Sequence, residues 1–378
     1  MKTALPLFVS CSPLLEDLLV EELQSLKLPC VQKGFRGAFV SEWDWSTIYK
    51  INYASRLASR VLLPLKKFRC FDARTLYQGV QEIDWTYFFA SPKSLAIDAN
   101  VYHPQIRNGL FAAQVVKDAI CDQLISKKRW RPDVDLKQPD IPLNLYIHQT
   151  NAVLSFDTSG LPLNKRGYRK ESVPAPIKET LAAAILKLAG YCSSQVFLDP
   201  CCGCGTLLIE AALIASKTPP GFLRKTWGFM HHPQFEEEKW GVICNQLNME
   251  KIPLKSDHFF ATDCSFQAVE ACQQNLAQAG IEKAEVSCTD FQKLTPRIAP
   301  NFLITNPPHG KRLEESKALY PLYRSLGKFI KTQCAKPAKA AIFVGGLELT
   351  KQIGLAAKKR HILDNGGVDS RLLEFEIY

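Results

Sequence analysis

The pattern of hydrophobic and polar positions divides this chain into two parts. Leucines at helical spacing mark residues 15–26, and short strand-like and helix-like stretches follow one another up to residue 157. This pattern predicts a small α+β region. Further on, apolar helices separate short apolar strands, which predicts an α/β domain with a mostly parallel, doubly wound sheet. Its expected strands cover residues 196–198, 259–262, 284–288, 302–305, 340–344 and 371–377.

The stretch that begins at Val196 carries the first chemical signal. The apolar strand stops at Asp199, Gly203 and Gly205 follow, and Thr206 opens an apolar, alanine-rich helix. Glycine has no Cβ, so these residues let the backbone turn tightly and approach a ligand closely. Strand, glycine turn and helix form the nucleotide-binding corner of an open α/β sheet. No Gly-Lys-Ser/Thr follows, which excludes a phosphate P-loop, and the pattern resembles the S-adenosylmethionine (SAM) loop of Rossmann-like methyltransferases.

Acidic residues end the next two strands of this domain. Asp263 follows the second strand, and Asp290 with Phe291 follows the third. For SAM, Asp199 is expected to orient the methionine ammonium and Asp263 to accept both ribose hydroxyls. Asp290 is expected to take the adenine amine, with Phe291 against its ring. Each acid alone is typical of a turn, but with the glycine loop they form a predicted cofactor site.

The fourth strand ends in Asn306-Pro307-Pro308-His309, which indicates the acceptor of the methyl group. An exocyclic base amine is a poor nucleophile because its lone pair is delocalised into the ring. The Asn306 side-chain oxygen and the Pro307 carbonyl can each accept one N–H of that amine and favour a localised lone pair. The two prolines fix the backbone, and His309 is expected to stack on the flipped-out base. These four residues are the predicted catalytic set.

Composition favours a compact protein with a polyanionic partner. The chain has 378 residues, of which 46% are hydrophobic, and a net charge of +10. Its 13 cysteines, with no obvious secretory signal, are expected to be reduced thiols of a cytoplasmic protein. No stretch is long and apolar enough to span a bilayer, so no membrane partner is expected.

Basic and aromatic residues gather at two places before the glycine loop. The helix expected over residues 111–125 ends in a segment with Lys128, Arg129 and Trp130, whose charges and ring suit phosphates and unstacked bases. A solvated helix end is the alternative. The second place is the basic joint of residues 161–172, either a plain linker or the lining of a cleft between domains. The candidate RNA contacts there are Arg166, Tyr168 and Arg169, joined by Lys178 at the start of the next helix.

An insertion of residues 217–257 lies between the first helix and the second strand of the α/β domain. It is rich in large aromatic residues and contains His231 and His232. Metal binding by these histidines would need partners at suitable spacing, which the sequence does not offer. No metal is therefore expected, and the segment is interpreted as a packed or substrate-facing lid.

Taken together, the chain resembles the THUMP-domain RNA guanine-N2 methyltransferases, in particular the bacterial enzymes that act on large-subunit ribosomal RNA. The resemblance rests on residues 116–120, 166–169, 175–179, 199–212 and 306–313. It implies SAM as cofactor, RNA as partner and a guanine N2 amine as acceptor. It also implies four regions: a ferredoxin-like region (1–60), a THUMP RNA-binding domain (61–157), a basic linker (158–173) and a Rossmann-like methyltransferase domain with a seven-stranded sheet (174–378).

Two residues depart from the family pattern. His309 stands where the family usually has tyrosine or phenylalanine, and an imidazole offers less stacking area. Cys204 stands in the glycine loop where serine is usual, which is a nearly isosteric change.

Other functions compete with this interpretation. The C-x-x-C of residues 201–204 could indicate redox chemistry or half a metal site, but it would not explain Asp263, Asp290 or Asn306. Asn-Pro-Pro motifs also occur in DNA adenine and protein glutamine methyltransferases. Transfer RNA is the rival substrate, and a decayed methyltransferase that only binds RNA is the rival role. The sequence leaves the oligomeric state and the modified nucleotide open.

Overall fold

A computed structural model describes residues 5–173, 176–309 and 317–378 of the chain. It divides into two compact units, and the chain passes between them more than once. Unit 1 contains the residues up to Cys11, Leu19–Leu163 and Arg224–Cys244. Unit 2 contains Ser12–Leu18, Asn164–Leu223 and Asn245–Tyr378.

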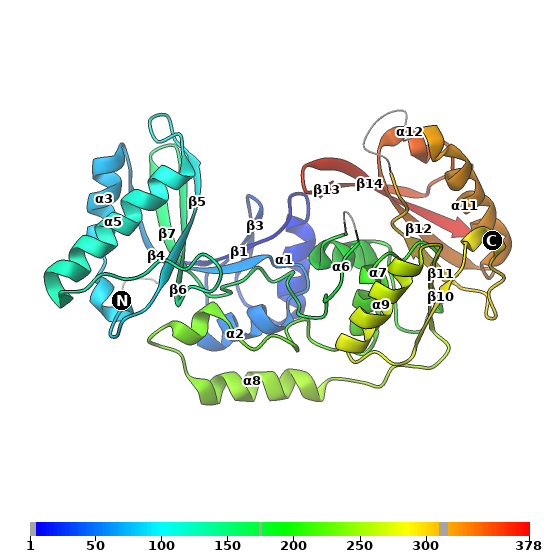
Figure 1. Cartoon of the computed structure of the whole chain (residues 1–378), viewed down its shortest axis with the longest axis horizontal. Coiled ribbons are helices and arrows are strands. Elements are labelled where there is room, and N and C mark those ends of the chain that lie inside the picture. Colours follow the sequence, from blue (N-terminus) through cyan, green and yellow to red (C-terminus); the bar gives the residue numbers. More distant parts are fainter. Residues whose placement is uncertain (1–4, 174–175, 310–316) are drawn as a thin grey trace. The chain divides into compact units, whose positions relative to one another are not determined.

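Unit 1 is built on one seven-stranded sheet of order β2-β3-β1-β4-β7-β6-β5 (Figure 1). The ten-residue strand β4 connects its two halves, because residues 60–62 pair with β1 and residues 62–69 pair with β7. β5 and β6 are parallel, and the other neighbours are antiparallel. The strands are β1 (Leu7–Ser10), β2 (Val31–Gly34), β3 (Gly37–Val40), β4 (Arg60–Arg69), β5 (Leu95–Tyr102), β6 (Ile141–His148) and β7 (Asn151–Asp157).

Side-chain caps set where several helices of this half begin. Asp44 and Asp72 each form a capping box with a threonine three residues on, and Asn108 caps the long helix α5. None of the described helices is both long and apolar enough to cross a bilayer. The helices up to residue 128 are α1 (Glu16–Ser25), α2 (Trp45–Ala54), α3 (Ala73–Gln81), α4 (Trp85–Phe88) and α5 (Gly109–Lys128).

The middle of the inserted segment packs on helix α2. Its short 3-10 helix η1 (Gly228–His231) and the start of α8 (Glu237–Met249) bring aromatic rings onto α2. The Phe229 ring lies 4.9 Å from Tyr49, and the Trp240 ring lies 5.4 Å from Tyr53. Burial lowers the pKa of His232 to about 4, and no group of three metal-ligating side chains occurs among the described residues. The middle of this segment, residues 227–240, is therefore packed within unit 1, whereas α8 has no buried residue and a substrate-facing role stays a prediction.

Unit 2 has a seven-stranded sheet of order β10-β9-β8-β11-β12-β14-β13 (Figure 1). The first five are parallel, and β14 runs antiparallel to both of its neighbours. This confirms the predicted fold class, a mostly parallel α/β sheet preceded by an α+β region. Its strands are β8 (Phe197–Asp199), β9 (Phe259–Asp263), β10 (Ala284–Cys288), β11 (Phe302–Thr305), β12 (Ala338–Gly345), β13 (Lys359–Asn365) and β14 (Val368–Ile377). Its helices are α6 (Glu179–Leu188), α7 (Thr206–Ala215), α9 (Phe266–Gln278), η2 (Phe291–Lys293), α11 (Tyr320–Gln333) and α12 (Leu347–Thr350).

Candidate active site

Polar residues at the carboxyl ends of four neighbouring strands define the site. Asp199 ends β8, Asp263 ends β9, Asp290 lies just beyond β10, and Asn306 follows β11. Because β10, β9, β8 and β11 are parallel neighbours, these four residues lie along one edge of the sheet. The strand order reverses between β8 and β11, which is where open α/β sheets bind ligands.

The glycine loop after β8 has the backbone that two glycines permit. Gly203 has φ +52° and Gly205 has φ +82°, both left-handed. A Cβ on Gly205 would lie 2.4 Å from Cys272 Sγ of α9, so close packing also requires glycine there. The Gly203 amide donates to Asp263 Oδ2 at 2.9 Å. Asp263 therefore fixes the loop, a role that the sequence did not reveal.

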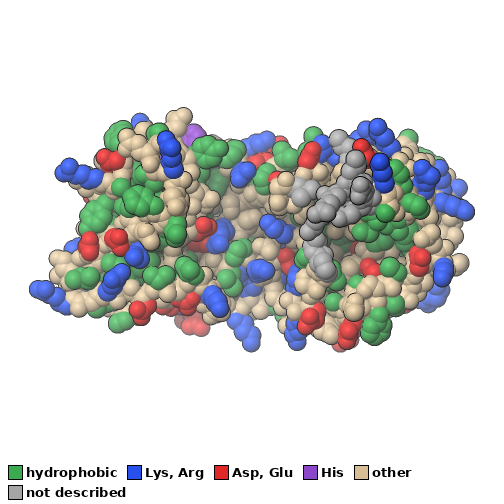
Figure 2. All heavy atoms as spheres, turned by 45° about the horizontal axis from the view of Figure 1, so that its top comes forward, with side chains coloured by type: hydrophobic (Ala, Val, Ile, Leu, Met, Phe, Trp, Pro, Cys, Tyr) green, Lys and Arg blue, Asp and Glu red, His purple; other side chains and the backbone are tan. Residues whose placement is uncertain are grey.

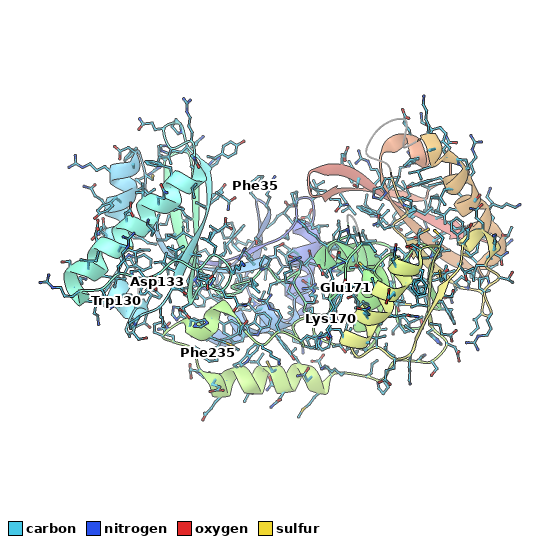
Figure 3. All side chains as sticks on the ribbon, in the orientation of Figure 1. Phe35, Trp130, Asp133, Lys170, Glu171 and Phe235 are labelled. Atoms are coloured by element: carbon cyan, nitrogen blue, oxygen red, sulfur yellow. The ribbon has the colours of Figure 1, made fainter. Side chains whose placement is uncertain are left out.

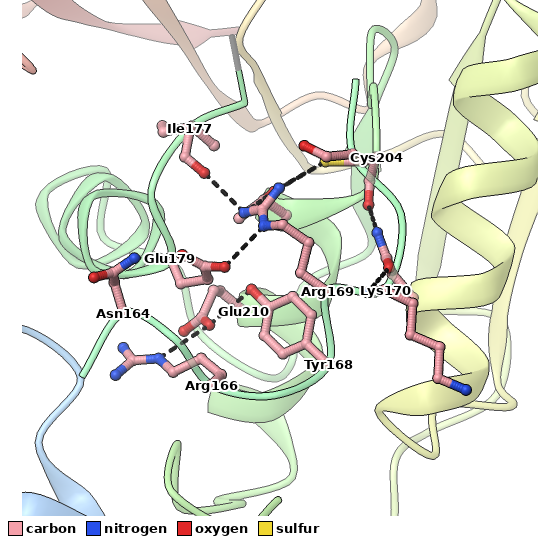
Figure 4. Close-up of polar contacts among 12 residues, drawn as sticks. Asn164, Arg166, Tyr168, Arg169, Lys170, Ile177, Glu179, Cys204 and Glu210 are labelled. Atoms are coloured by element: carbon pink, nitrogen blue, oxygen red, sulfur yellow. Dashed lines mark hydrogen bonds and ion pairs between the residues drawn. The ribbon is translucent and has the colours of Figure 1, made fainter. Parts of the chain in front are cut away.

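Arg169 ties the glycine loop to the segment before α6 (Figure 4). Its guanidinium donates to Glu179 Oε1 at 2.9 Å and to the Ile177 carbonyl at 3.0 Å. It also donates to Cys204 Sγ at 2.8 Å and to Thr206 Oγ1 at 3.1 Å. These contacts give Arg169 a loop-positioning role inside unit 2, and its predicted RNA contact stays a prediction.

Asn275 holds the same loop from α9 and was missed by sequence reasoning. It is fully buried, and its Nδ2 donates to the carbonyls of Cys204 and Glu171, each at 3.0 Å. Its Oδ1 accepts from the amide of Lys170 at 2.8 Å, and Lys170 and Glu171 lie beside α9 (Figure 3). An amide within the apolar stripe of α9 was the signal that could have identified it.

Arg166 and Tyr168 lie inside unit 2, which corrects the prediction that they contact RNA. Their exposed fractions are 2% and 1%. Both reach Glu210 of α7, itself fully buried: Tyr168 Oη donates to Glu210 Oε1 at 3.0 Å, and Arg166 Nε lies 3.6 Å from the same oxygen (Figure 4). Burial, together with the nearby carboxylates of Glu210 and Glu179, raises the pKa of Tyr168 well above its usual range. A buried acid needs such partners, and Glu210 within an alanine-rich helix was the available sequence signal.

Asp199 is a buried carboxyl whose charge is incompletely compensated. Burial raises its pKa to about 7, which outweighs the opposite effect of hydrogen bonds from Thr305 and the Cys201 amide. A buried carboxylate is stabilised by a nearby cation. The chemistry of this group therefore fits the methionine ammonium of SAM, although its role remains a prediction.

Asp290 and Phe291 lie at the start of the short helix η2. The Asp290 side chain caps that helix by accepting from the Gln292 amide at 3.0 Å, and it stays partly exposed. Phe291 is 3% exposed and packs edge-on against Phe329 of α11, with ring centroids 5.6 Å apart. The adenine contacts assigned to the pair stay predictions, and the packing of Phe291 adds a core role.

The segment Asn306–His309 presents an unused hydrogen-bond acceptor. Asn306 Oδ1 is buried and has no hydrogen-bond partner among the described residues. Tyr323 of α11 donates from Oη to the Pro308 carbonyl at 3.2 Å, which helps to hold the segment in position. His309 packs on Gly345 and meets Phe343 edge-on at 6.3 Å. Burial lowers the pKa of His309, partly opposed by a hydrogen bond with the Pro307 backbone, so the ring is neutral at neutral pH.

The other predicted RNA contacts lie at the surface. Lys128 and Arg129 are exposed at the end of α5, while Trp130 is half-buried against Phe89 (Figure 3). Lys178 is exposed at the start of α6, where the helix dipole disfavours a cation. In Figure 2 basic side chains are spread over the visible face instead of forming one block. On this face the charges therefore do not locate an RNA site, and these contacts stay predictions.

Comparison with known proteins identifies three domain families in the chain. Residues 166–374 match the RMKL-like methyltransferase domain. Residues 71–157 match the THUMP domain, and residues 6–62 match the RlmL ferredoxin-like domain.

Three similar proteins cover the whole chain. A protein of Synechocystis sp., named as a candidate RNA methyltransferase, is 35% identical over 100% of this chain and 98% of its own length. The ribosomal RNA large subunit methyltransferase K/L of Syntrophotalea carbinolica is 37% identical over 100% of this chain and 54% of its own, so the chain spans about half of that relative. The crystal structure of SMU.472, a candidate methyltransferase complexed with SAH, superposes with a TM-score of 0.86 at 26% identity and covers 100% of this chain and 99% of that one.

Proposed function

Since the chain belongs to the RMKL-like methyltransferase family and uses SAM as cofactor, we propose that it methylates the exocyclic N2 amine of a guanine in RNA. Large-subunit ribosomal RNA is the proposed substrate, because the K/L relatives are named for that RNA. The THUMP domain implies RNA binding. Transfer RNA guanine-N2 is the alternative within the same chemistry.

The observation that carries the proposal is the buried Asn306 Oδ1, which has no hydrogen-bond partner in the part of the chain that the structure describes. A buried oxygen without a partner costs folding free energy, so its retention points to a donor brought by the substrate. An exocyclic amine supplies such a donor. SAM supplies an electrophilic methyl group when it is bound.

Each residue of the segment then has a defined task. Asn306 Oδ1 accepts one N–H of the amine and the Pro307 carbonyl accepts the other, which directs the nitrogen lone pair out of the base plane. The Pro308 carbonyl is held by Tyr323, so the two acceptors stay in position. His309 provides a neutral ring for the flipped base.

The cofactor site follows the strand ends described above. Gly203, Gly205 and Thr206 provide the loop, and Asp199 faces the ammonium. Asp263 takes the ribose hydroxyls in addition to fixing the loop, and Asp290 takes the adenine amine. Lys128, Arg129, Trp130 and Lys178 remain the proposed RNA contacts.

A methyl-transfer assay tests the proposal. Purified protein is incubated with methyl-labelled SAM and, in parallel, with large-subunit ribosomal RNA and bulk transfer RNA, and the RNA is digested to nucleosides. We expect N2-methylguanosine from ribosomal RNA, formed about a thousandfold more slowly with Asn306→Ala. If only transfer RNA yields this product, transfer RNA is the substrate instead. A methylated adenosine, or the absence of any transfer, would refute the guanine assignment.

Arg169→Lys is expected to weaken SAM binding about tenfold while kcat changes little. Lysine keeps the charge but cannot contact Glu179, Cys204 and Thr206 together, so the glycine loop loses a brace. Isothermal titration measures the SAM affinity. Arg224→Lys is the matched control, since Arg224 also donates to carbonyls but within unit 1. Equal SAM affinities for the two variants would contradict the positioning role.

His309→Phe is expected to keep the transfer rate within about threefold, and His309→Ala to lower it about tenfold or more, because base–ring stacking is lost. Single-turnover rates at saturating SAM and RNA measure the effect. Identical rates for the alanine and phenylalanine variants would show that the ring at this position does not stack on the base.

A further inference from the structure

The sheet of unit 1 has an uncovered face at its β4–β7–β6–β5 end. Residues alternate across these strands, and one set is buried: Leu145, Ile147, Ala152 and Leu154 are fully buried. Helices α3 and α5 pack on that side (Figure 1), where the Phe68 ring lies against Gly79 of α3. On the opposite side, at the β6–β7 turn end, Tyr146 and His148 are exposed and Asn151 and Val153 are partly exposed.

The exposed set contains three aromatic rings in neighbouring strands. Tyr102 of β5 pairs in register with His148 of β6, and Tyr146 lies two residues before His148. The Tyr146 and His148 rings are stacked, with an interplanar angle of 3° and centroids 6.4 Å apart, and the Tyr102 ring lies 6.3 Å from His148. Tyr102 is 78% exposed and Tyr146 is 41% exposed. Rings held this far out of the core add little to folding, so they are available to a ligand.

Cations flank the rings on the same face. Lys67 of β4 is in register with Val153, which pairs with Tyr146, and Arg69 is in register with Asn151, which pairs with His148. Both side chains are exposed, and Arg69 donates to Thr150 Oγ1 at 3.1 Å. We call the group formed by Lys67, Arg69, Tyr102, Tyr146 and His148 the aromatic face. Asp98 lies four residues before Tyr102, on the same side of β5, and is an exposed acid near the aromatic face. The two cations, Lys67 and Arg69, outnumber this one acid.

We propose that the aromatic face binds a single-stranded segment of the RNA substrate, with unstacked bases on Tyr102, Tyr146 and His148 and phosphates beside Lys67 and Arg69. A sheet that exposes rings in adjacent strands is a surface on which successive bases stack, and stacking tolerates any base. A duplex hides the faces of its bases, so the rings favour unpaired RNA. The inference rests on the proposed function in one respect, that the substrate is RNA.

The test uses the full chain and a fluorescein-labelled 12-nucleotide RNA of mixed sequence without self-complementarity. Its affinity is measured by fluorescence anisotropy for wild type and for the double variant Tyr102→Ala/Tyr146→Ala. We expect the double variant to bind about tenfold or more weakly, because two stacking contacts are lost. Tyr378→Ala is the matched control, since Tyr378 is 81% exposed and lies in unit 2, and it is expected to bind like wild type.

Two further variants separate stacking from other causes. Tyr102→Phe/Tyr146→Phe keeps the rings and is expected to restore affinity to within about twofold of wild type. For Lys67→Gln/Arg69→Gln, the slope of log K against the logarithm of the salt concentration is expected to become less steep by about 1.4, the value for two phosphate contacts on a single strand. Thermal unfolding of each variant controls for folding.

The outcomes distinguish this inference from the proposed function. Unchanged RNA affinity in the double alanine variant overturns the inference, even where methyl transfer proceeds normally. A wild-type dimer, seen by light scattering and lost in that variant with RNA affinity unchanged, also overturns it. Lost oligonucleotide binding supports the inference, even where wild type methylates neither RNA and the proposed function fails.

Discussion

Asn306→Ala is expected to lower the rate of methyl transfer about a thousandfold and to leave SAM affinity within about twofold. Removing one preorganised dipole from a site of this kind costs about 10²–10³ in rate. The buried Asn306 Oδ1 lacks a partner among the described residues, so the loss of this oxygen breaks no hydrogen bond with them. The effect therefore falls on the reaction, while unfolding temperature stays near that of wild type.

Single-turnover transfer from labelled SAM and isothermal titration of SAM measure the two quantities. Asn306→Asp keeps an acceptor in place and is expected to retain more activity than Asn306→Ala. Asn301→Ala is a structural control, because Asn301 Oδ1 accepts from the Val196 amide at 2.7 Å and its loss should reduce stability more than rate. A transfer rate for Asn306→Ala within tenfold of wild type would rule out the proposed role.

Asp199→Asn is expected to abolish SAM binding and to stabilise the ligand-free protein at pH 8. Burial raises the pKa of Asp199 from 3.8 to about 7. The folded protein therefore holds a proton between pH 4 and 7 that the unfolded chain has released, and stability falls as pH rises through this window. At 1.36 kcal/mol per pKa unit the loss reaches up to about 4 kcal/mol for this buried group. Asparagine carries no charge and avoids the loss.

The pH dependence of SAM binding runs in the opposite direction. Only the ionised carboxylate pairs with the methionine ammonium, so wild-type SAM affinity is expected to fall as pH drops below 7. In thermal unfolding at pH 8 without SAM, Asp199→Asn is expected to melt about 4 °C or more above wild type, and at about pH 4, where this window begins, the two should melt nearly alike. Addition of SAM should raise the melting temperature of wild type but not that of Asp199→Asn.

Asp290→Asn is the matched control for this experiment. Asp290 is partly exposed and caps η2, so its replacement is expected to weaken SAM binding without raising stability at pH 8. If Asp199→Asn keeps the thermal shift with SAM, then Asp199 does not face the ammonium.

Much of unit 2 could be predicted from local sequence. Strands of three to five apolar residues that end in Asp199, Asp263 or Asn306 predicted both the parallel sheet and the edge where polar residues meet. This works because parallel strands present the same end to the same edge of the sheet. The left-handed backbone of Gly203 and Gly205 could also be predicted, since glycine is the residue that adopts it at little cost.

The contacts between distant segments could not be predicted in this way. A basic motif predicts charge at the surface, but Arg166 and Tyr168 are buried because Glu210 of α7 lies opposite them. Asn275, distant in sequence from the glycine loop, braces it through a contact that no local pattern encodes. The packed insertion likewise depends on rings of α2.

The sequence by itself therefore determined the order of strands and helices, the glycine turn and the chemistry at the strand ends. These features depend on the spacing of apolar side chains along the chain and on the conformational freedom of the backbone, both of which are set by residues close together in sequence. Only the tertiary structure decided which charges are paired and buried, and which face of the first sheet stays open with Tyr102, Tyr146 and His148. Period two predicts that a strand has two faces, but the helices that cover one of them come from elsewhere in the chain.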